Sequence, residues 1–500
     1  MSSMVTPREH AGLCATDTGL LRAVAAGEAR LTGEQGLALM AALPLGELGR
    51  WADARCRAVH GDRLRTYVID RNINYTNVCT ARCTFCAFRR DAGDEDAYTL
   101  DTGVIHEKVA ELVAIGGTQI LMQGGMNPAL PIAWYERLLS GIKSRFPGVH
   151  IHAFSPPEFI EFVSFFDPPG STLEEKIRWV MVRLKDAGLD SVPGGGGEIF
   201  ADPVRRKIGL GKCDAQAWLT TMYVAHTLGM FTSATMMFGH IEGFADRVHH
   251  MLQVRRWQDR VRREAEEGRG PRGHYVSFIS WPFQRENTPL GRVPDWGFDE
   301  GELELEFPGD AVARAWASVR GGDANGSGGQ GLPRGSRAAD VFDYDAMDRA
   351  GFPSASLFGK RVRMSGAADY LRTQALSRLM LDNVYSIGAS WVTMGPHIGQ
   401  VAMAFGANDM GSVMMEENVV SSAGTTFCLD EALLCRLIRT SGFTPAQRNN
   451  TYDLVRVHAG SDRDPDLAVT DWSVHRAKRT HQQVLRAPAL SGVKITVNAR

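Results

Sequence analysis

Long apolar runs and a strong charge of either sign are both missing from this 500-residue sequence. No uninterrupted run of about eighteen apolar residues occurs, so we expect no helix that spans a membrane. The formal net charge is −2, without the basic excess that a phosphate backbone attracts, and we therefore expect no nucleic-acid partner. The opening residues, MSSMVTPREHAGL, lack a basic region followed by an apolar core, so we expect no secretory signal.

Cysteine is also scarce, and eight cysteines in a chain of 500 residues do not form a disulfide scaffold. Together with the missing signal, this scarcity predicts a cytoplasmic protein in a reducing environment. What is present is an ordinary globular balance, with 44% apolar and 22% charged residues. The length allows either one large barrel with appendages or two to three smaller domains.

The order of apolar patterns predicts an α/β fold. From about Leu20 to His60, apolar residues recur at three- and four-residue spacing, which predicts a helical N-terminal segment over 1–64. Eight short apolar or β-branched runs then alternate with helical stretches, which predicts a parallel (β/α)8 barrel of the TIM type over 65–411. The predicted strands are 66–73, 118–124, 149–155, 189–194, 232–239, 275–283, 388–395 and 401–408. Residues 412–500 read as a helical C-terminal extension with a polar tail.

One segment interrupts the barrel pattern. Residues 291–366 contain GGDANGSGGQGLPRGS, whose glycine and serine content cannot build a core. We interpret this segment as an insertion into the barrel. A tolerated expansion is the default interpretation, and a lid or a partner site are the alternatives.

Three of the cysteines, Cys79, Cys83 and Cys86, lie together in NYTNVCTARCTFCAFRR with C-x3-C-x2-C spacing. Soft thiolates hold iron–sulfur clusters, and three thiolates on one tight loop can ligate three corners of a cubane. The fourth iron then has no protein ligand and can bind a substrate. Iron–sulfur chemistry with S-adenosylmethionine is one of the few ways in which a protein obtains a carbon radical. The spacing therefore predicts a 4Fe–4S cluster and S-adenosylmethionine as cofactors.

The alternatives are a structural zinc site or three unrelated core cysteines. Zinc requires a fourth Cys or His, usually in a second C-x2-C pair, and the sequence has no such pair. The aromatic Phe85 inside the last cysteine pair and the position of the motif just after the first predicted strand also favour the radical interpretation. A non-catalytic iron–sulfur carrier or a zinc-stapled scaffold stays open as a competing class.

In a barrel enzyme the chemistry lies at the C-terminal ends of the strands. Gly124 and Gly125 end the second predicted strand, where small residues let the backbone approach a cofactor. Ser155 and Glu158 follow the third strand. Glu198 closes PGGGGE after the fourth, a loop that can fold around a ligand and offer a carboxylate to ribose hydroxyls. We predict that these residues face the cofactor or the substrate.

Further polar residues follow later strands. His240, Gln284 and Asn287 end the fifth and sixth strands, which places polar groups at the mouth of the barrel, although each could equally cap a helix. His150 and His152 share one face of the third strand. Packed or substrate-bonding histidines are commoner there than a metal site.

With these motifs assembled, residues 65–450 resemble the cyclic dehypoxanthinyl futalosine synthases, radical cyclases of the futalosine route to menaquinone. The resemblance rests on INYTNVCTARCTFCAF, QGGMNP, HIHAFSPPE, AGLDSVPGGGGEIF, SATMMFGHIE, FISWPFQRENT and FGANDMGSVMMEENV. The aminofutalosine synthases and deazaflavin synthases share the first and third motifs in looser form, and they are the alternative families. Two departures are Gly197, where the family usually has Ala, and Arg89, where a Tyr is common.

The resemblance implies conversion of dehypoxanthine futalosine to its cyclic product, by hydrogen abstraction at ribose C4′ and radical addition to the benzoate ring. It implies that Cys79, Cys83 and Cys86 hold the cluster and that an external donor such as flavodoxin or ferredoxin reduces it. The implied contacts to S-adenosylmethionine are Phe85, Gly124, Gly125, Ser155 and Glu198. The implied catalytic residues are Glu158, His240, Gln284 and Asn287.

Overall fold

The computed structural model describes residues 19–270, 273–294 and 362–459. Three helices lead into the barrel, as the sequence predicts: α1 (Gly19–Ala26), α2 (Gly33–Ala42) and α3 (Leu45–His60). A capping box starts α2, because Thr32 Oγ1 accepts from the Gln35 backbone N–H at 3.2 Å and the Gln35 side chain accepts from the Thr32 N–H at 2.9 Å. Helix α3 packs against α14 (Ala367–Met380), which ties this segment to the barrel wall.

The predicted parallel barrel is confirmed. Its strands are β1 (Leu64–Val68), β2 (Asp70–Ile73), β3 (Gln119–Met122), β4 (His150–Ala153), β5 (Thr232–Phe238), β6 (Tyr275–Pro282), β7 (Ser386–Gly388) and β8 (Asp409–Ser412). One continuous stretch forms β1 and β2: β1 pairs with β8, and β2 pairs with β3. Single bridges from Ser191 to His152 and from Val192 to Thr232 join β4 to β5. The predicted fourth strand is therefore reduced to these two residues, and the ring of parallel pairs is closed.

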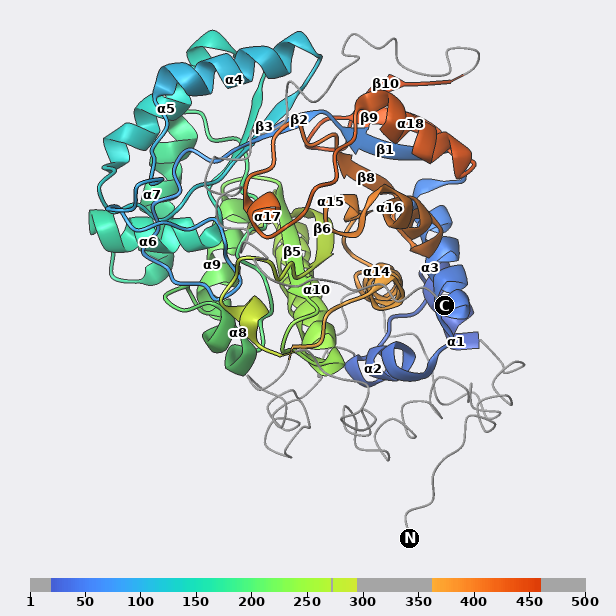
Figure 1. Ribbon diagram of the computed structural model, residues 1–500. Helices are drawn as coiled ribbons and strands as arrows, with labels where there is room; N and C mark the ends of the chain where they lie inside the picture. Colours follow the sequence, from blue (N-terminus) through green and yellow to red (C-terminus); the bar gives the residue numbers. More distant parts are fainter. Residues whose placement is uncertain (1–18, 271–272, 295–361, 460–500) are drawn as a thin grey trace, which may run out of the picture.

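Helices surround the ring of strands (Figure 1). They are α4 (Thr102–Ala114), α5 (Ile132–Arg145), α6 (Pro156–Phe166), α7 (Leu173–Asp186), α8 (Asp202–Ile208), α9 (Ala215–Thr227), α10 (Phe244–Glu266), α14, α15 (Trp391–Met394), α16 (Pro396–Ala402), α17 (Val419–Ser422) and α18 (Glu431–Thr440), with short 3-10 turns at η2 (Leu290–Arg292) and η4 (Met403–Phe405). Buried apolar side chains between strands and helices form the core, which the strand residues Ile120, Ile151 and Phe278 exemplify.

Two strand predictions near the end of the barrel were wrong. The strand expected over 388–395 ends at Gly388 and is followed by α15. In the stretch expected as a strand over 401–408, residues 401–405 belong to α16 and η4, and the rest is a turn and coil. Short apolar runs do not distinguish strand from helix by periodicity. Pro396 begins α16 in the first helical turn, where it needs no N–H partner. The last barrel strand, β8, comes directly after this helical stretch.

The C-terminal extension is only partly helical, which corrects the prediction for this region. Helices α17 and α18 are present, but β9 (Thr444–Arg448) pairs in parallel with β1, and β10 (Leu454–Val457) pairs antiparallel with β9. Residues 460–500 of the predicted tail lie outside the described residues. The predicted domain boundaries at 64 and 411 stay predictions.

Most of the predicted insertion, residues 295–361, also lies outside the described residues. Its two flanks meet, because the Val362 N–H donates to the Pro294 carbonyl at 2.9 Å. The next residue, Arg363, donates its N–H to the His240 carbonyl at 2.8 Å. The barrel thus continues across the segment from η2 to α14.

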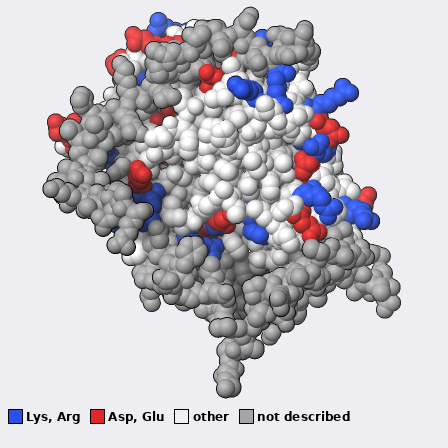
Figure 2. Space-filling model, turned by 45° about the vertical axis from the view of Figure 1, so that its right-hand side comes forward, with Lys and Arg blue, Asp and Glu red and all other residues white. Residues whose placement is uncertain are grey.

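Figure 2 brings forward the face on the side of α3, α16 and α18. Side chains of both signs lie around its edge and uncharged side chains fill its middle. Within the described ranges, no helix combines the length and the hydropathy that crossing a membrane requires.

Candidate active site

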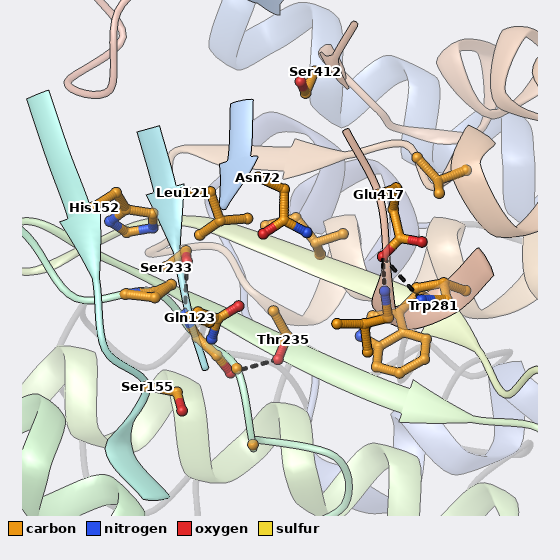
Figure 3. Close-up of a pocket in the computed structure, with 18 of the residues that line it drawn as sticks. Asn72, Leu121, Gln123, His152, Ser155, Ser233, Thr235, Trp281, Ser412 and Glu417 are labelled. Atoms are coloured by element: carbon orange, nitrogen blue, oxygen red, sulfur yellow. Dashed lines mark hydrogen bonds between the residues drawn. The ribbon is translucent and has the colours of Figure 1, made fainter. Parts of the chain in front are cut away.

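A cavity of about 460 Å³ lies inside the barrel and reaches the C-terminal ends of its strands. Side chains from β2 through β8 and from the loops after them line it (Figure 3). Cys79, Cys83 and Cys86 all belong to its wall. The structure therefore brings the three thiols together with the strand ends, as a barrel enzyme requires.

The cysteine loop is pinned by backbone hydrogen bonds. Arg82 N–H donates to the Leu210 carbonyl and Thr84 N–H donates to the Ile208 carbonyl, both at 2.8 Å. These two bonds dock the loop onto the segment that follows α8. Backbone contacts within the protein thus help to hold the segment that carries the thiols.

The thiols suit a cluster by their chemistry. Burial raises the pKa of Cys79, and it raises the pKa of Cys83 to about 12, because a thiolate without a partner is unfavourable in an apolar setting. Iron supplies the positive partner that such a thiolate needs. A structural zinc needs four donors around one ion, whereas among the described residues no three His, Cys, Asp or Glu side chains are grouped to hold a metal ion. In a cubane each of the three thiolates binds a different iron.

Gly124 and Gly125 line the cavity beside the cysteine loop. A Cβ on Gly125 would lie 2.1 Å from the Val78 carbonyl oxygen, and a Cβ on Gly124 would lie 2.5 Å from the Tyr75 ring. The two glycines are therefore required by the close approach of the cysteine loop to the end of β3. Their predicted contact with S-adenosylmethionine stays a prediction.

Glu198 ends the glycine loop and also lines the cavity. Its Oε1 accepts from Lys212 Nζ at 2.5 Å, and the same ammonium group lies 4.9 Å from the centre of the Phe85 ring. Burial opposes ionisation of Glu198, but Lys212 outweighs it and lowers the pKa of this carboxyl. Lys212 joins two predicted cofactor residues, and the sequence analysis missed it, since RRKIGLGK reads only as a basic run.

Arg205 is a second residue that the sequence analysis missed. Its buried guanidinium donates to the Gly197 carbonyl at 2.8 Å and to the Gly196 carbonyl at 2.9 Å, and its Nε donates to the Cys213 carbonyl at 2.8 Å. One side chain thus holds the glycine loop to the segment that carries Lys212.

Ser155 and Glu158 lie on the cavity wall at the start of α6. The Glu158 carboxylate accepts from the Ser155 N–H at 2.6 Å, the Ser155 hydroxyl at 2.7 Å, the Tyr75 hydroxyl at 2.8 Å and the Gly124 N–H at 3.1 Å. These hydrogen bonds lower the pKa of Glu158, but burial has the larger effect and raises it. With four donors in place, the geometry indicates that Glu158 positions the strand ends; the predicted catalytic role stays a prediction.

The structure does not bring His240, Gln284 and Asn287 to the cavity wall. His240 is buried beside Glu242, 3.0 Å from its carboxylate, in an ion cluster outside the cavity. Gln284 donates to the Pro282 carbonyl at 3.1 Å and Asn287 donates to the Ser422 carbonyl at 2.9 Å. These bonds fix the loops after β5 and β6, so the geometry does not support a catalytic role for the three residues.

His150 and His152 share a bonding partner, as their common strand face predicts. The Nε2 of His150 and the Nδ1 of His152 each lie 2.6 Å from Ser191 Oγ. Only His152 of the pair lines the cavity. Burial lowers the pKa of His152 to about 3, so its ring is neutral at pH 7.

Comparison with known proteins decides the family. Residues 73–254 match the family model of the Radical SAM superfamily, and residues 356–460 match the CofH/MqnC C-terminal region. A cyclic dehypoxanthine futalosine synthase from Halalkalibacterium halodurans is 34% identical over 88% of this chain and 95% of its own length. A second, from Streptomyces coelicolor, is 34% identical over 89% of this chain and 90% of its own length. This chain belongs to the cyclic dehypoxanthine futalosine synthase family of radical S-adenosylmethionine enzymes.

Related enzymes and solved structures agree with this placement. The aminodeoxyfutalosine synthase of Thermus thermophilus is 32% identical over 86% of this chain and 93% of its own length. The crystal structure of methylornithine synthase superposes with a TM-score of 0.53 at 15% identity, covering 86% of this chain and 97% of that one. The crystal structure of the FeFe-hydrogenase maturase HydG superposes with a TM-score of 0.52 at 13% identity, covering 90% of this chain and 81% of the HydG chain. The structural likenesses concern the barrel fold alone. The chain is an enzyme that uses a 4Fe–4S cluster and S-adenosylmethionine.

Proposed function

We propose that this chain converts dehypoxanthine futalosine to cyclic dehypoxanthinyl futalosine in menaquinone biosynthesis. One observation carries the proposal: a single cavity joins the three thiols to both a polar and an aromatic wall, which fits a substrate with a ribose and a benzoate ring. The 34% identity to two enzymes of that name over most of their length supports it.

The chain's own residues have three tasks in this reaction. Cys79, Cys83 and Cys86 hold the cluster. When bound, the cluster and S-adenosylmethionine supply the radical chemistry that takes hydrogen from ribose C4′ and lets that carbon add to the benzoate ring. The glycine loop, held by Arg205, leaves room for the cofactor beside the thiols. The barrel surrounds the reacting groups and limits their contact with water.

The final step removes one electron and one proton from the ring. The bound cluster would supply the electron acceptor, and a side chain is needed to accept the proton. Of the four catalytic residues predicted from the sequence, only Glu158 lies on the cavity wall. Its four donors favour the charged carboxylate, whereas its burial favours the protonated form. Its place on the cavity wall supports Glu158 as our proposed proton acceptor.

The reaction also requires an external one-electron donor, for which we propose a flavodoxin or a ferredoxin, and a cytoplasmic location. The seven cysteines that the structure describes are all free thiols, which a reducing compartment maintains. Purified donors of both types, added in place of dithionite, test this part of the proposal by their support of turnover.

Anaerobic turnover followed by mass analysis tests the function. The reconstituted enzyme, dithionite, S-adenosylmethionine and dehypoxanthine futalosine should give 5′-deoxyadenosine and a product lighter than the substrate by two hydrogen atoms. Consumption of an enolpyruvyl benzoate instead would identify an aminofutalosine synthase. Release of no 5′-deoxyadenosine would indicate a non-catalytic iron–sulfur carrier.

A matched pair of cysteine variants tests the cluster. Cys83→Ala should lose the 4Fe–4S signal in electron paramagnetic resonance and cleave no cofactor. Cys428→Ala, which changes a free thiol outside the cavity wall, should keep both. A full signal and full cleavage in Cys83→Ala would contradict the cluster assignment.

A further inference from the structure

The three thiols lie in an apolar setting. A small buried cluster forms from Ala81, Cys83 and Met126, and the side chains packed against it are Cys79, Phe85, Cys86 and Phe165. A fixed charge close to such a cluster is screened less than a charge in water. Any charged side chain held near the cysteine loop therefore has a strong influence on negative charge at the sulfurs.

One ammonium group is held beside this loop. The Lys212 Nζ lies 4.9 Å from the centre of the Phe85 ring, and Phe85 stands between Cys83 and Cys86 in the chain. The Lys212 side chain is 15% exposed and lines the same cavity as the thiols. The ammonium group is thus a positive charge next to the place where the cluster is held.

The backbone on both sides of Lys212 is tied to its surroundings. The Leu210 carbonyl accepts from the Arg82 N–H of the cysteine loop at 2.8 Å. The Cys213 carbonyl accepts from Arg205 Nε at 2.8 Å. Because these bonds lie immediately before and after Lys212, the fold sets the position of its charge relative to the cysteine loop.

Glu198 compensates only part of this charge at the thiols. Burial raises the pKa of Cys83, and Lys212 opposes this rise more strongly than the Glu198 carboxylate adds to it. Burial also raises the pKa of Cys79, and Lys212 again acts in the opposite direction. The ion pair therefore acts on the cysteine loop as a net positive charge.

We propose that Lys212 raises the reduction potential of the 4Fe–4S cluster and that Glu198 limits the size of this effect. On reduction, the external donor loses one electron and the cluster gains it, together with one unit of negative charge. A fixed positive charge nearby stabilises the reduced cluster relative to the oxidised one, and net charge is one of the factors that set a cluster's potential. Lys212 thus makes the cluster easier to reduce. The inference needs the cluster but not the substrate of the proposed function.

A redox titration followed by electron paramagnetic resonance tests this role. The probe is the signal of the reduced cluster in the reconstituted full chain, measured without S-adenosylmethionine. In Lys212→Met the ratio of reduced to oxidised cluster at the wild-type midpoint potential should fall about tenfold, which corresponds to a midpoint about 59 mV more negative. In Glu198→Gln the midpoint should shift in the opposite direction, to a less negative value.

Two further variants separate charge from structure. Lys212→Arg keeps the positive charge and should keep the same ratio within about twofold. Arg206→Met removes an exposed charge from α8, where solvent and salt screen it, and should also stay within about twofold. A purely structural role of Lys212 predicts a weaker signal in Lys212→Met with an unchanged midpoint.

The double variant Lys212→Met with Glu198→Gln guards against a folding defect in the single one, which leaves a buried carboxylate without its partner. Since the influence of Lys212 on the thiols exceeds that of Glu198, the double variant should also have a more negative midpoint than wild type. The shift should be smaller than in Lys212→Met, about threefold in the ratio.

The signs of these shifts decide the outcome. A midpoint equal to or less negative than that of wild type, in Lys212→Met or in the double variant, overturns the inference. A midpoint of Glu198→Gln that is unchanged or more negative overturns it as well. None of these measurements contains dehypoxanthine futalosine, so a wild-type enzyme that does not convert this compound overturns the proposed function alone.

Discussion

Lys212 places its ammonium group 2.5 Å from the Glu198 carboxylate, and the two side chains are 15% and 5% exposed. Burial alone would lower the pKa of Lys212, but Glu198 raises it, and Lys212 in turn lowers the pKa of Glu198. Both groups are therefore charged at neutral pH. Since Lys212 also lies over the Phe85 ring, the pair connects the glycine loop to the cysteine loop.

Removing the cation of this pair should destabilise the protein. Lys212→Met leaves the buried Glu198 carboxylate without its partner, and we expect a loss of about 3 kcal/mol in the free energy of unfolding by urea. The double variant Lys212→Met with Glu198→Gln removes both charges and should recover most of this loss. Equal free energies of unfolding for the wild type and the Lys212→Met variant would show that the ion pair does not contribute to stability.

A methyl group at Gly125 should displace the cysteine loop. The new Cβ would lie 2.1 Å from the Val78 carbonyl oxygen, which has to move together with the cysteine that follows it. We expect Gly125→Ala to fold but to retain less than about half of the wild-type iron and sulfide after reconstitution. Gly148→Ala is the control, because a Cβ there meets nothing within 4 Å. Full iron content in Gly125→Ala would mean that the cysteine loop shifts to accommodate the methyl group and still binds the cluster.

Local patterns explain what could be predicted from the sequence. The cysteines and Glu198 lie in short motifs at strand ends, and the parallel barrel brings strand ends together whatever the exact strand limits are. The same logic did not place His240 and Asn287 on the cavity wall, because a residue after a strand can point away from the cavity and bond elsewhere. His240 Nε2 lies 3.2 Å from the Met237 carbonyl in β5, and Asn287 donates to the Ser422 carbonyl in α17. Polar identity and position in a motif do not determine that direction.

Residues whose role depends on tertiary contacts could not be predicted. Lys212 and Arg205 lie in a basic stretch with no motif, and only the folded chain shows that both reach the glycine loop. Asn72 and Gln119 lie in strands, and the sequence does not show whether a polar side chain in a strand has a hydrogen-bond partner. The helical residues 401–405 were missed because apolar residues in a short run suit either a strand or a helix.

Arg205 should act through the loop that it holds. Arg205→Lys keeps the charge but cannot donate to the Gly196 and Gly197 carbonyls in a fixed fork. We expect about a tenfold increase in the KM for S-adenosylmethionine, a smaller fall in kcat, and an unchanged cluster signal. Arg206→Lys, at an exposed position of the same helix, is the control and should leave both constants unchanged. A fall in kcat alone would contradict a role in placing the loop.

Buried histidines should make the protein acid-sensitive, and His226 allows a clean measurement because it does not line the cavity. Burial lowers its folded-state pKa to about 3, with His274 adding to the effect, whereas an unfolded histidine has a pKa of about 6.5. Above pH 6.5 neither state binds the proton, so the effect is absent. Between pH 6.5 and 3 only the unfolded chain binds it, and stability falls as the pH falls.

Between pH 7 and pH 5 this one residue should account for a loss of about 2 kcal/mol in the free energy of unfolding. His226→Gln removes the titrating ring and keeps a polar partner for Thr232 Oγ1, which lies 2.7 Å from the His226 Nε2. Urea unfolding at the two pH values should therefore give a smaller difference for the variant than for wild type, by about 2 kcal/mol. The variant's own stability at pH 7 does not enter this difference. If the free energy of unfolding changed equally between the two pH values in the variant and in wild type, His226 would have the same pKa in the folded and unfolded states. Burial would then not hold the ring neutral.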